Sequence, residues 1–303
     1  MSTKELQDQE VDRFDDYQRD VRGLSLATRR NYSRIVRRLL EVRFGASEIV
    51  FSALQPADVR RFVADQLEQR TTASNAGLIA AALRAYFRYR GTCGNDVHAL
   101  TGVIVSPAHW SLASLPKSLT DDEIERLLGA FPPELPSCRR AYAMVRCALD
   151  MGLRSSEIAK LALTDIDWPA GTVTLRGTKS RREDILPLPA STGQAIADYL
   201  RYERPRTSNR AVFVRRLAPH DVPIGPDAVR RLIRAAYQRI GLTHGRTHAL
   251  RYSLARRLLA QGSSLKEVAD VLRHRSLDTS RVYAKLDSRT LSAVALPWPG
   301  SAT

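Results

Sequence analysis

The sequence predicts a mainly α-helical protein with a small β-sheet, an α+β fold built from two domains. The chain has 303 residues, which is more than a single hydrophobic core usually supports. Over most of its length the apolar residues recur at helical spacing. Two runs within residues 171–188 instead have the composition of short strands on either side of a polar stretch.

The first domain is expected to be a helical bundle that covers residues 22–105. One helix is predicted over Thr28–Phe44, because its apolar side chains share one face. These side chains are Tyr32, Ile35, Val36, Leu39 and Leu40. Two more helices are predicted, from Pro56 to Leu67 and from Ser74 to Tyr89. Residues 1–21 are acidic and are expected to form a frayed N-terminus.

The second domain is expected to cover residues 115–289, after a linker at residues 106–114 that lacks helical periodicity. Its first helix should follow Thr120, which can cap the helix and form a capping box with Glu123. Residues 290–303 form a C-terminal tail, which could contact a neighbouring subunit or pack on its own domain.

Inside the second domain the sequence predicts helices, then a hairpin, then more helices. After the helix that follows Thr120, the next two helices are expected at Arg139–Asp150 and Ser155–Leu163, with a turn at residues 152–154 between them. Two strands are expected at residues 171–176 and 184–188, and the polar residues between them should form the tip of a β-hairpin. The rest of the domain should be mostly helical.

The charge of the chain favours an extended polyanion as a partner. Lysine and arginine total 47 against 32 acidic residues, a formal charge of +15, so nucleic acid is the first candidate and a general effect on solubility is the alternative. Residues 22–90 hold 13 basic and 5 acidic residues, a net charge of +8. This makes the first domain a plausible DNA-binding module.

The cysteine and histidine patterns indicate no metal site, and no cofactor is expected. The 3 cysteines form no CxxC pair and are expected to stay reduced, and the 6 histidines show no HExxH motif. The chain contains no apolar run long enough to cross a bilayer, and its first residues are too acidic for a signal peptide. A cytoplasmic location is therefore expected.

Side chains suited to phosphoryl transfer occur at separate places along the second domain: Arg154, Lys179, His248 with Arg251, and His274 followed by Tyr283. Taken singly, each has an ordinary explanation, such as a solvated cation or a core aromatic. His248 and Arg251 stand three residues apart, which places both on one face of a helix. The order of all these residues along the chain indicates phosphoryl transfer more specifically than any one of them does alone.

The surrounding motifs resemble those of the tyrosine recombinases, a family that includes phage integrases, Xer recombinases and transposon-encoded recombinases. The motifs are Met151-Gly152-Leu153-Arg154-Ser155-Ser156-Glu157-Ile158, His248-Ala249-Leu250-Arg251, Leu272-Arg273-His274 and Tyr283-Ala284-Lys285. Two features depart from the common pattern. Arg273 stands where many members have glycine, and the hairpin between Lys179 and Pro187 is long.

The resemblance implies a helical core-binding domain, a catalytic domain and a site-specific recombinase that acts through a 3′-phosphotyrosine intermediate. Tyr283 would be the nucleophile, and Arg154, Arg251 and His274 would bind the phosphate. Lys179 would protonate the leaving 5′ oxygen, and His248 would act as general base. An accessory factor that binds DNA without cutting it, and a type IB topoisomerase, are the alternatives.

The implied partner is double-stranded DNA at a specific site, bound by a tetramer of identical or related recombinases at synapsis. Candidate DNA contacts are Arg29, Arg30, Arg34, Arg37, Arg38, Arg84, Arg88, Arg181 and Arg182. Such contacts to phosphates make binding depend steeply on salt. Phage integration, transposon movement and chromosome resolution stay open as biological settings.

Overall fold

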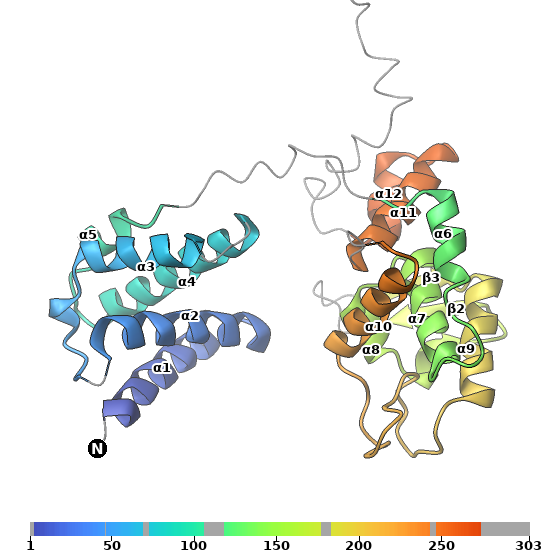
Figure 1. Cartoon of the computed structure of the whole chain (residues 1–303), viewed down its shortest axis with the longest axis horizontal. Coiled ribbons are helices and arrows are strands. Elements are labelled where there is room, and N and C mark those ends of the chain that lie inside the picture. Colours follow the sequence, from blue (N-terminus) through green and yellow to red (C-terminus); the bar gives the residue numbers. More distant parts are fainter. Residues whose placement is uncertain are drawn as a thin grey trace, which may run out of the picture. The chain divides into compact units, whose positions relative to one another are not determined.

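The protein divides into two compact units, Met1–Ser111 and Leu112–Thr303, each with its own hydrophobic core. The computed structural model describes residues 3–45, 47–68, 73–105, 118–176, 183–242 and 247–273. Its helices and its small sheet confirm the predicted fold class (Figure 1). Within these ranges no helix is both long and apolar enough to cross a membrane.

The first unit is a helical bundle in which one long helix packs against two others. Its elements are α1 (Thr3–Asp20), α2 (Leu26–Phe44), the short 3-10 helix η1 (Phe51–Ala53), α3 (Pro56–Glu68), α4 (Ala73–Thr92) and α5 (His98–Gly102). Helix α2 lies against both α1 and α4 (Figure 1). The predicted inner face of α2 is confirmed, because Ile35, Val36, Leu39 and Leu40 are buried. Tyr32 packs against the same core and is partly buried.

The N-terminal helix α1 belongs to the core of this unit, so the expectation of a frayed terminus was wrong for residues 3–20. Phe14 is fully buried and Val11 is 2% exposed. Glu10 accepts hydrogen bonds from the Tyr86 hydroxyl and from Nη1 of Arg90, both at 2.9 Å. Both donors belong to α4, so contacts with residues distant in sequence stabilise α1.

Acidic residues of α1 pair with basic residues of the neighbouring helix. Asp8 forms an ion pair with Arg37 at 3.1 Å, and Asp15 forms one with Arg29 at 2.9 Å. Both arginines belong to α2. The negative charge that suggested a solvated terminus therefore complements the basic helix beside it.

The second unit is built around helix α7, which packs against several of the other helices. Its helices are α6 (Asp121–Leu128), α7 (Cys138–Asp150), α8 (Ser155–Lys160), the 3-10 helix η2 (Leu163–Asp165), α9 (Ala190–Tyr202), α10 (Pro226–Arg239), α11 (Thr247–Ala260) and α12 (Leu265–Val271). Helix α7 packs against α9, α10 and α11. The predicted capping box of α6 is confirmed, with Thr120 and Glu123 each bound to the other's backbone N–H. The helix predicted to reach Leu163 ends at Lys160.

The sheet has three antiparallel strands in the order β1 (Ile166–Asp167), β2 (Thr172–Leu175) and β3 (Asp184–Pro187). The predicted hairpin is confirmed in its strands, with Val173 opposite Leu186 and both side chains buried. Strand β1 was not predicted, because two residues are too few to show the alternation of apolar and polar side chains that indicates a strand. The hairpin tip at residues 177–182 lies outside the described residues.

Candidate active site

A tight turn after α7 presents Arg154. Gly152 has φ +59°, a conformation that favours glycine, and a Cβ there would lie 2.7 Å from Cδ2 of Leu272 and 3.0 Å from Cδ2 of Leu254. Leu153 is fully buried and anchors the turn in the core. The turn therefore brings Arg154 next to the end of α12 and the middle of α11.

Glu157 fixes the position of Arg154. Its carboxylate accepts the backbone N–H of Arg154 at 2.8 Å and Nη1 of the same residue at 2.7 Å. The Arg154 side chain nevertheless stays 33% exposed. Its Nη2 also donates to the Arg273 carbonyl, at 3.4 Å, and the exposed part of the guanidinium can still reach a ligand.

Arg251 on α11 is buried and links the turn before Arg154 to the end of α12. It is 3% exposed. Its Nη1 donates to the Gly152 carbonyl, and its Nη2 donates to the Leu272 carbonyl at 2.6 Å. The residue thus connects the Arg154 turn with the C-terminal end of α12.

His248 lies one helical turn before Arg251 on α11, as the HxxR spacing predicts. Desolvation lowers the pKa of His248, and the positive charges of Arg251, Arg154 and Arg230 lower it further. The imidazole is therefore neutral at pH 7 and can accept a proton. Geometry places the two site arginines together, because Arg251 donates to the Gly152 and Leu272 carbonyls and Arg154 donates to the adjacent Arg273 carbonyl. His248 lies one turn before Arg251 on α11.

Arg273 adds a third guanidinium to this cluster. Its φ is +54°, in the left-handed region where glycine is favoured. Its Nη2 lies 2.8 Å from Oε2 of Glu157 and 3.3 Å from the Gly152 carbonyl. The chain therefore turns this side chain inward, toward the carboxylate that also holds Arg154.

Glu157 stays ionised between these cations. Burial raises the pKa of Glu157, but the charge of Arg273, the backbone N–H of Arg154 and the side chain of Arg154 outweigh burial, so the pKa is lowered. Sequence reasoning missed Glu157 and Arg273 as members of the site. The three-residue spacing from Arg154 to Glu157 within a helix was the available signal for the first.

Several of the predicted site residues lie outside the described residues: Lys179, Arg181, Arg182, His274 and Tyr283. Among the residues that the structure does describe, no group of histidine, cysteine and carboxylate side chains is arranged to hold a metal ion. The described part of the site thus consists of arginines, one carboxylate and one neutral histidine.

The candidate DNA contacts of the first unit fall into two groups. Arg30, Arg34 and Arg38 follow each other at four-residue spacing on α2, and Arg84 and Arg88 do so on α4; all five are exposed. Arg37 is exposed as well, although it pairs with Asp8. Arg29 is only 11% exposed and pairs with Asp15, which argues against a contact with DNA.

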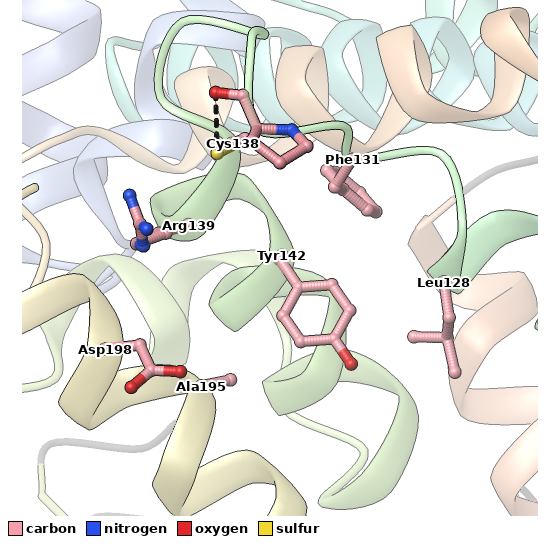
Figure 2. Close-up of a pocket in the computed structure, with 8 residues that line it drawn as sticks. Leu128, Phe131, Cys138, Arg139, Tyr142, Ala195 and Asp198 are labelled. Carbon is pink, nitrogen blue, oxygen red and sulfur yellow. Dashed lines mark hydrogen bonds between the residues drawn. The ribbon is translucent and has the colours of Figure 1, made fainter. Parts of the chain in front are cut away.

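A separate cavity of about 360 Å³ opens between α6, α7 and α9. Figure 2 shows the Phe131 and Tyr142 rings at its wall and the Cys138 thiol hydrogen-bonded at its edge. Arg139 and Asp198 are the charged residues that line it. Its lining includes none of Arg154, Arg251 and Arg273, so this cavity is separate from the candidate active site.

Each of the two units of the chain matches a known protein-family domain. Residues 11–91 match the phage integrase N-terminal SAM-like domain, and residues 117–289 match the phage integrase family. The two matches together define the class of protein as an integrase with an N-terminal helical domain and a second domain that carries the candidate site. The chain belongs to the phage integrase family and is a site-specific tyrosine recombinase.

Individual relatives agree with this assignment. The integrase/recombinase y4rA of Sinorhizobium fredii is 41% identical over 97% of this chain and 72% of its own. The tyrosine recombinase XerA of Thermococcus onnurineus is 29% identical over 88% of this chain and 87% of its own. The structure of a lambda integrase tetramer bound to a Holliday junction has the same fold, with a TM-score of 0.68 and 17% identity over 88% of this chain and 77% of that one.

Proposed function

We propose that the recombinase binds one scissile phosphate with Arg154 and Arg251 and attacks it with Tyr283, forming a 3′-phosphotyrosine link. The observation that supports this most directly is the convergence of two arginines and a neutral histidine at the Gly152 turn. Guanidinium groups suit the non-bridging oxygens of a phosphate, because they are permanently charged and donate in pairs.

The remaining roles come from the family pattern. His248 accepts the proton of the Tyr283 hydroxyl, in keeping with the lowered pKa of His248. His274 donates to the phosphate, and Lys179 protonates the leaving 5′ oxygen. The phosphotyrosine bond preserves the energy of the broken phosphodiester, so rejoining needs neither ATP nor a metal ion.

DNA is held mainly by exposed arginines on α2 and α4. The four-residue spacing of Arg30, Arg34 and Arg38 aligns them along one face of α2. Arg84 and Arg88 extend the basic surface on α4, which packs against α2. Because such contacts displace counterions, affinity should fall steeply with salt.

Strand exchange between two duplexes requires four nucleophiles, so we place a tetramer of this chain, or of this chain with related recombinases, at synapsis. The tetrameric lambda integrase bound to a Holliday junction supports this assembly by its fold. The C-terminal tail at residues 290–303 is a candidate subunit contact. We also propose a cytoplasmic location, where a chromosomal or mobile DNA substrate would be met.

Covalent trapping tests the reaction and identifies the DNA site in the same experiment. The purified protein is incubated with a pool of nicked duplexes of randomised sequence, in which the short fragment diffuses away after cleavage and prevents rejoining. We expect a denaturation-resistant protein–DNA adduct whose DNA ends share a common sequence. Tyr283→Phe should bind the same DNA and form no adduct.

The alternatives predict other outcomes. DNA binding without an adduct in the unmodified protein would indicate an accessory factor. Relaxation of a supercoiled plasmid that lacks the recovered sequence would indicate a topoisomerase. Either result would contradict the proposal.

A further inference from the structure

Two guanidinium groups share a single carboxylate in this site. Nη1 of Arg154 lies 2.7 Å from Oε1 of Glu157, and Nη2 of Arg273 lies 2.8 Å from Oε2. The side chains of Arg273 and Glu157 are only 5% and 8% exposed, whereas Arg154 is 33% exposed. Arg273 and Glu157 therefore form the inner part of the cluster, and Arg154 forms the part that a ligand can reach.

The charges in the site suggest a role for Arg273, which is to neutralise the Glu157 carboxylate. In the described part of the site Arg154, Arg251 and Arg273 carry positive charge, and Glu157 carries the opposing negative charge. Without Arg273, Glu157 would have Arg154 as its nearest counter-ion and would draw that guanidinium away from an incoming phosphate. With Arg273 present, the negative charge is already neutralised from the inner side.

The backbone conformation of Arg273 is a second, independent indication that its side chain has a role. A φ of +54° is a conformation in which glycine avoids the steric cost that other residues incur. A glycine would thus suit the main chain better, and what arginine adds is the inward side chain. Nη1 of that side chain also donates to the Val271 carbonyl at 3.0 Å, which holds the guanidinium in place.

We propose that Arg273 is a positioning residue for cleavage: it neutralises Glu157 and thereby leaves Arg154 free to bind the scissile phosphate. The inference rests on the proposed function of Arg154. Arg273 itself does not touch the DNA in this scheme. Its effect belongs to the cleavage step rather than to DNA affinity, because affinity is distributed over many phosphate contacts.

The test compares single-turnover adduct formation on a nicked duplex that the unmodified protein cleaves. Arg273→Gly keeps a favoured backbone and removes the whole side chain, including the guanidinium. We expect its cleavage rate to fall roughly 10- to 100-fold, as when a reacting group is misplaced, with DNA affinity little changed. The melting temperature should fall because a buried ion pair is lost, but the protein should stay folded, since Glu157 keeps Arg154 as a partner. Arg273→Lys keeps the charge and should recover part of the lost rate.

A second variant, Glu157→Gln, tests whether Arg273 acts through the Glu157 carboxylate. If Arg273 acts through the charge of Glu157, then Glu157→Gln removes the need for it, and the double variant should cleave as fast as Glu157→Gln alone. Arg256→Ala is the matched control, because it removes one positive charge from α11 where Arg256 pairs with the exposed Asp121. Its cleavage rate should equal that of the unmodified protein.

Three results would overturn the inference. The first is Arg273→Gly cleaving within about twofold of the unmodified protein, a difference too small for a misplaced reacting group. The second is a full additional loss in the double variant, which would show that Arg273 acts independently of Glu157. The third is loss of folding together with cleavage in Arg273→Gly. Absence of any adduct with the unmodified protein would instead refute the proposed function, and the inference would fall with it.

Discussion

Gly152 allows a direct test of how the active-site turn is packed. Replacing it by alanine adds a Cβ that would lie 2.7 Å from Leu272 and 3.0 Å from Leu254, at φ +59°. The left-handed conformation costs about 1 to 2 kcal/mol for a residue other than glycine. Overpacking adds about 1 to 3 kcal/mol, so Gly152→Ala should lower the free energy of unfolding by about 2 to 5 kcal/mol.

Gly171→Ala is the matched control, because that glycine has φ +61° and nothing within 4 Å of an added Cβ. It should lose only the backbone part, about 1 to 2 kcal/mol. Urea unfolding of the second unit, followed by circular dichroism, measures both changes. Equal losses in the two variants would refute the packing argument, because the two positions share the backbone strain and differ only in their neighbours.

Three further predictions concern other parts of the chain. Phe14→Ala should destabilise the first unit by about 3 to 5 kcal/mol in a thermal melt, since the ring is fully buried; a loss below about 1 kcal/mol would show that α1 is peripheral. Thr120→Ala should cost about 1 kcal/mol in urea unfolding of the second unit, since it removes the capping box of α6; no loss would contradict the role of the cap. Because the pKa of His248 is lowered from its ordinary value of 6.5, the midpoint of the loss of adduct formation on acidification should lie below 6.5; a midpoint above 6.5 would argue against His248 as the base.

The parts of the fold that the sequence predicts well are those governed by local periodicity. The buried face of α2 follows from the spacing of residues such as Val36 and Leu40. The strand pair β2 and β3 follows from two short runs on either side of a polar stretch. His248 and Arg251 fall on one face of α11 for the same reason, because three residues make nearly one helical turn.

The parts that sequence reasoning missed depend on contacts between distant residues. Helix α1 has few apolar residues, and Glu10 finds its partners Tyr86 and Arg90 in α4. Arg273 is separated by 116 positions from Glu157, so no local pattern pairs them. From the sequence, Arg273 can be noticed only because many family members have glycine at this position. The inward orientation of its side chain can be seen only in the folded structure.

The burial of Arg251 distinguishes it from Arg154, the other arginine proposed to bind the phosphate. Arg251 is 3% exposed and donates to the carbonyls of Gly152 and Leu272, whereas Arg154 is 33% exposed. Arg251→Ala would leave the Leu272 carbonyl without this donor, and an unsatisfied buried carbonyl costs about 1 to 3 kcal/mol.

Arg251→Ala should therefore lower both the cleavage rate and the melting temperature. Arg154→Ala should lower the cleavage rate, on the order of 100- to 1000-fold, with a smaller effect on melting. Thermal melts beside single-turnover cleavage separate the two cases. Equal melting temperatures for both variants would mean that Arg251 does not tie the turn of Gly152 to the end of α12, and the rigid placement of Arg154 would then need another cause.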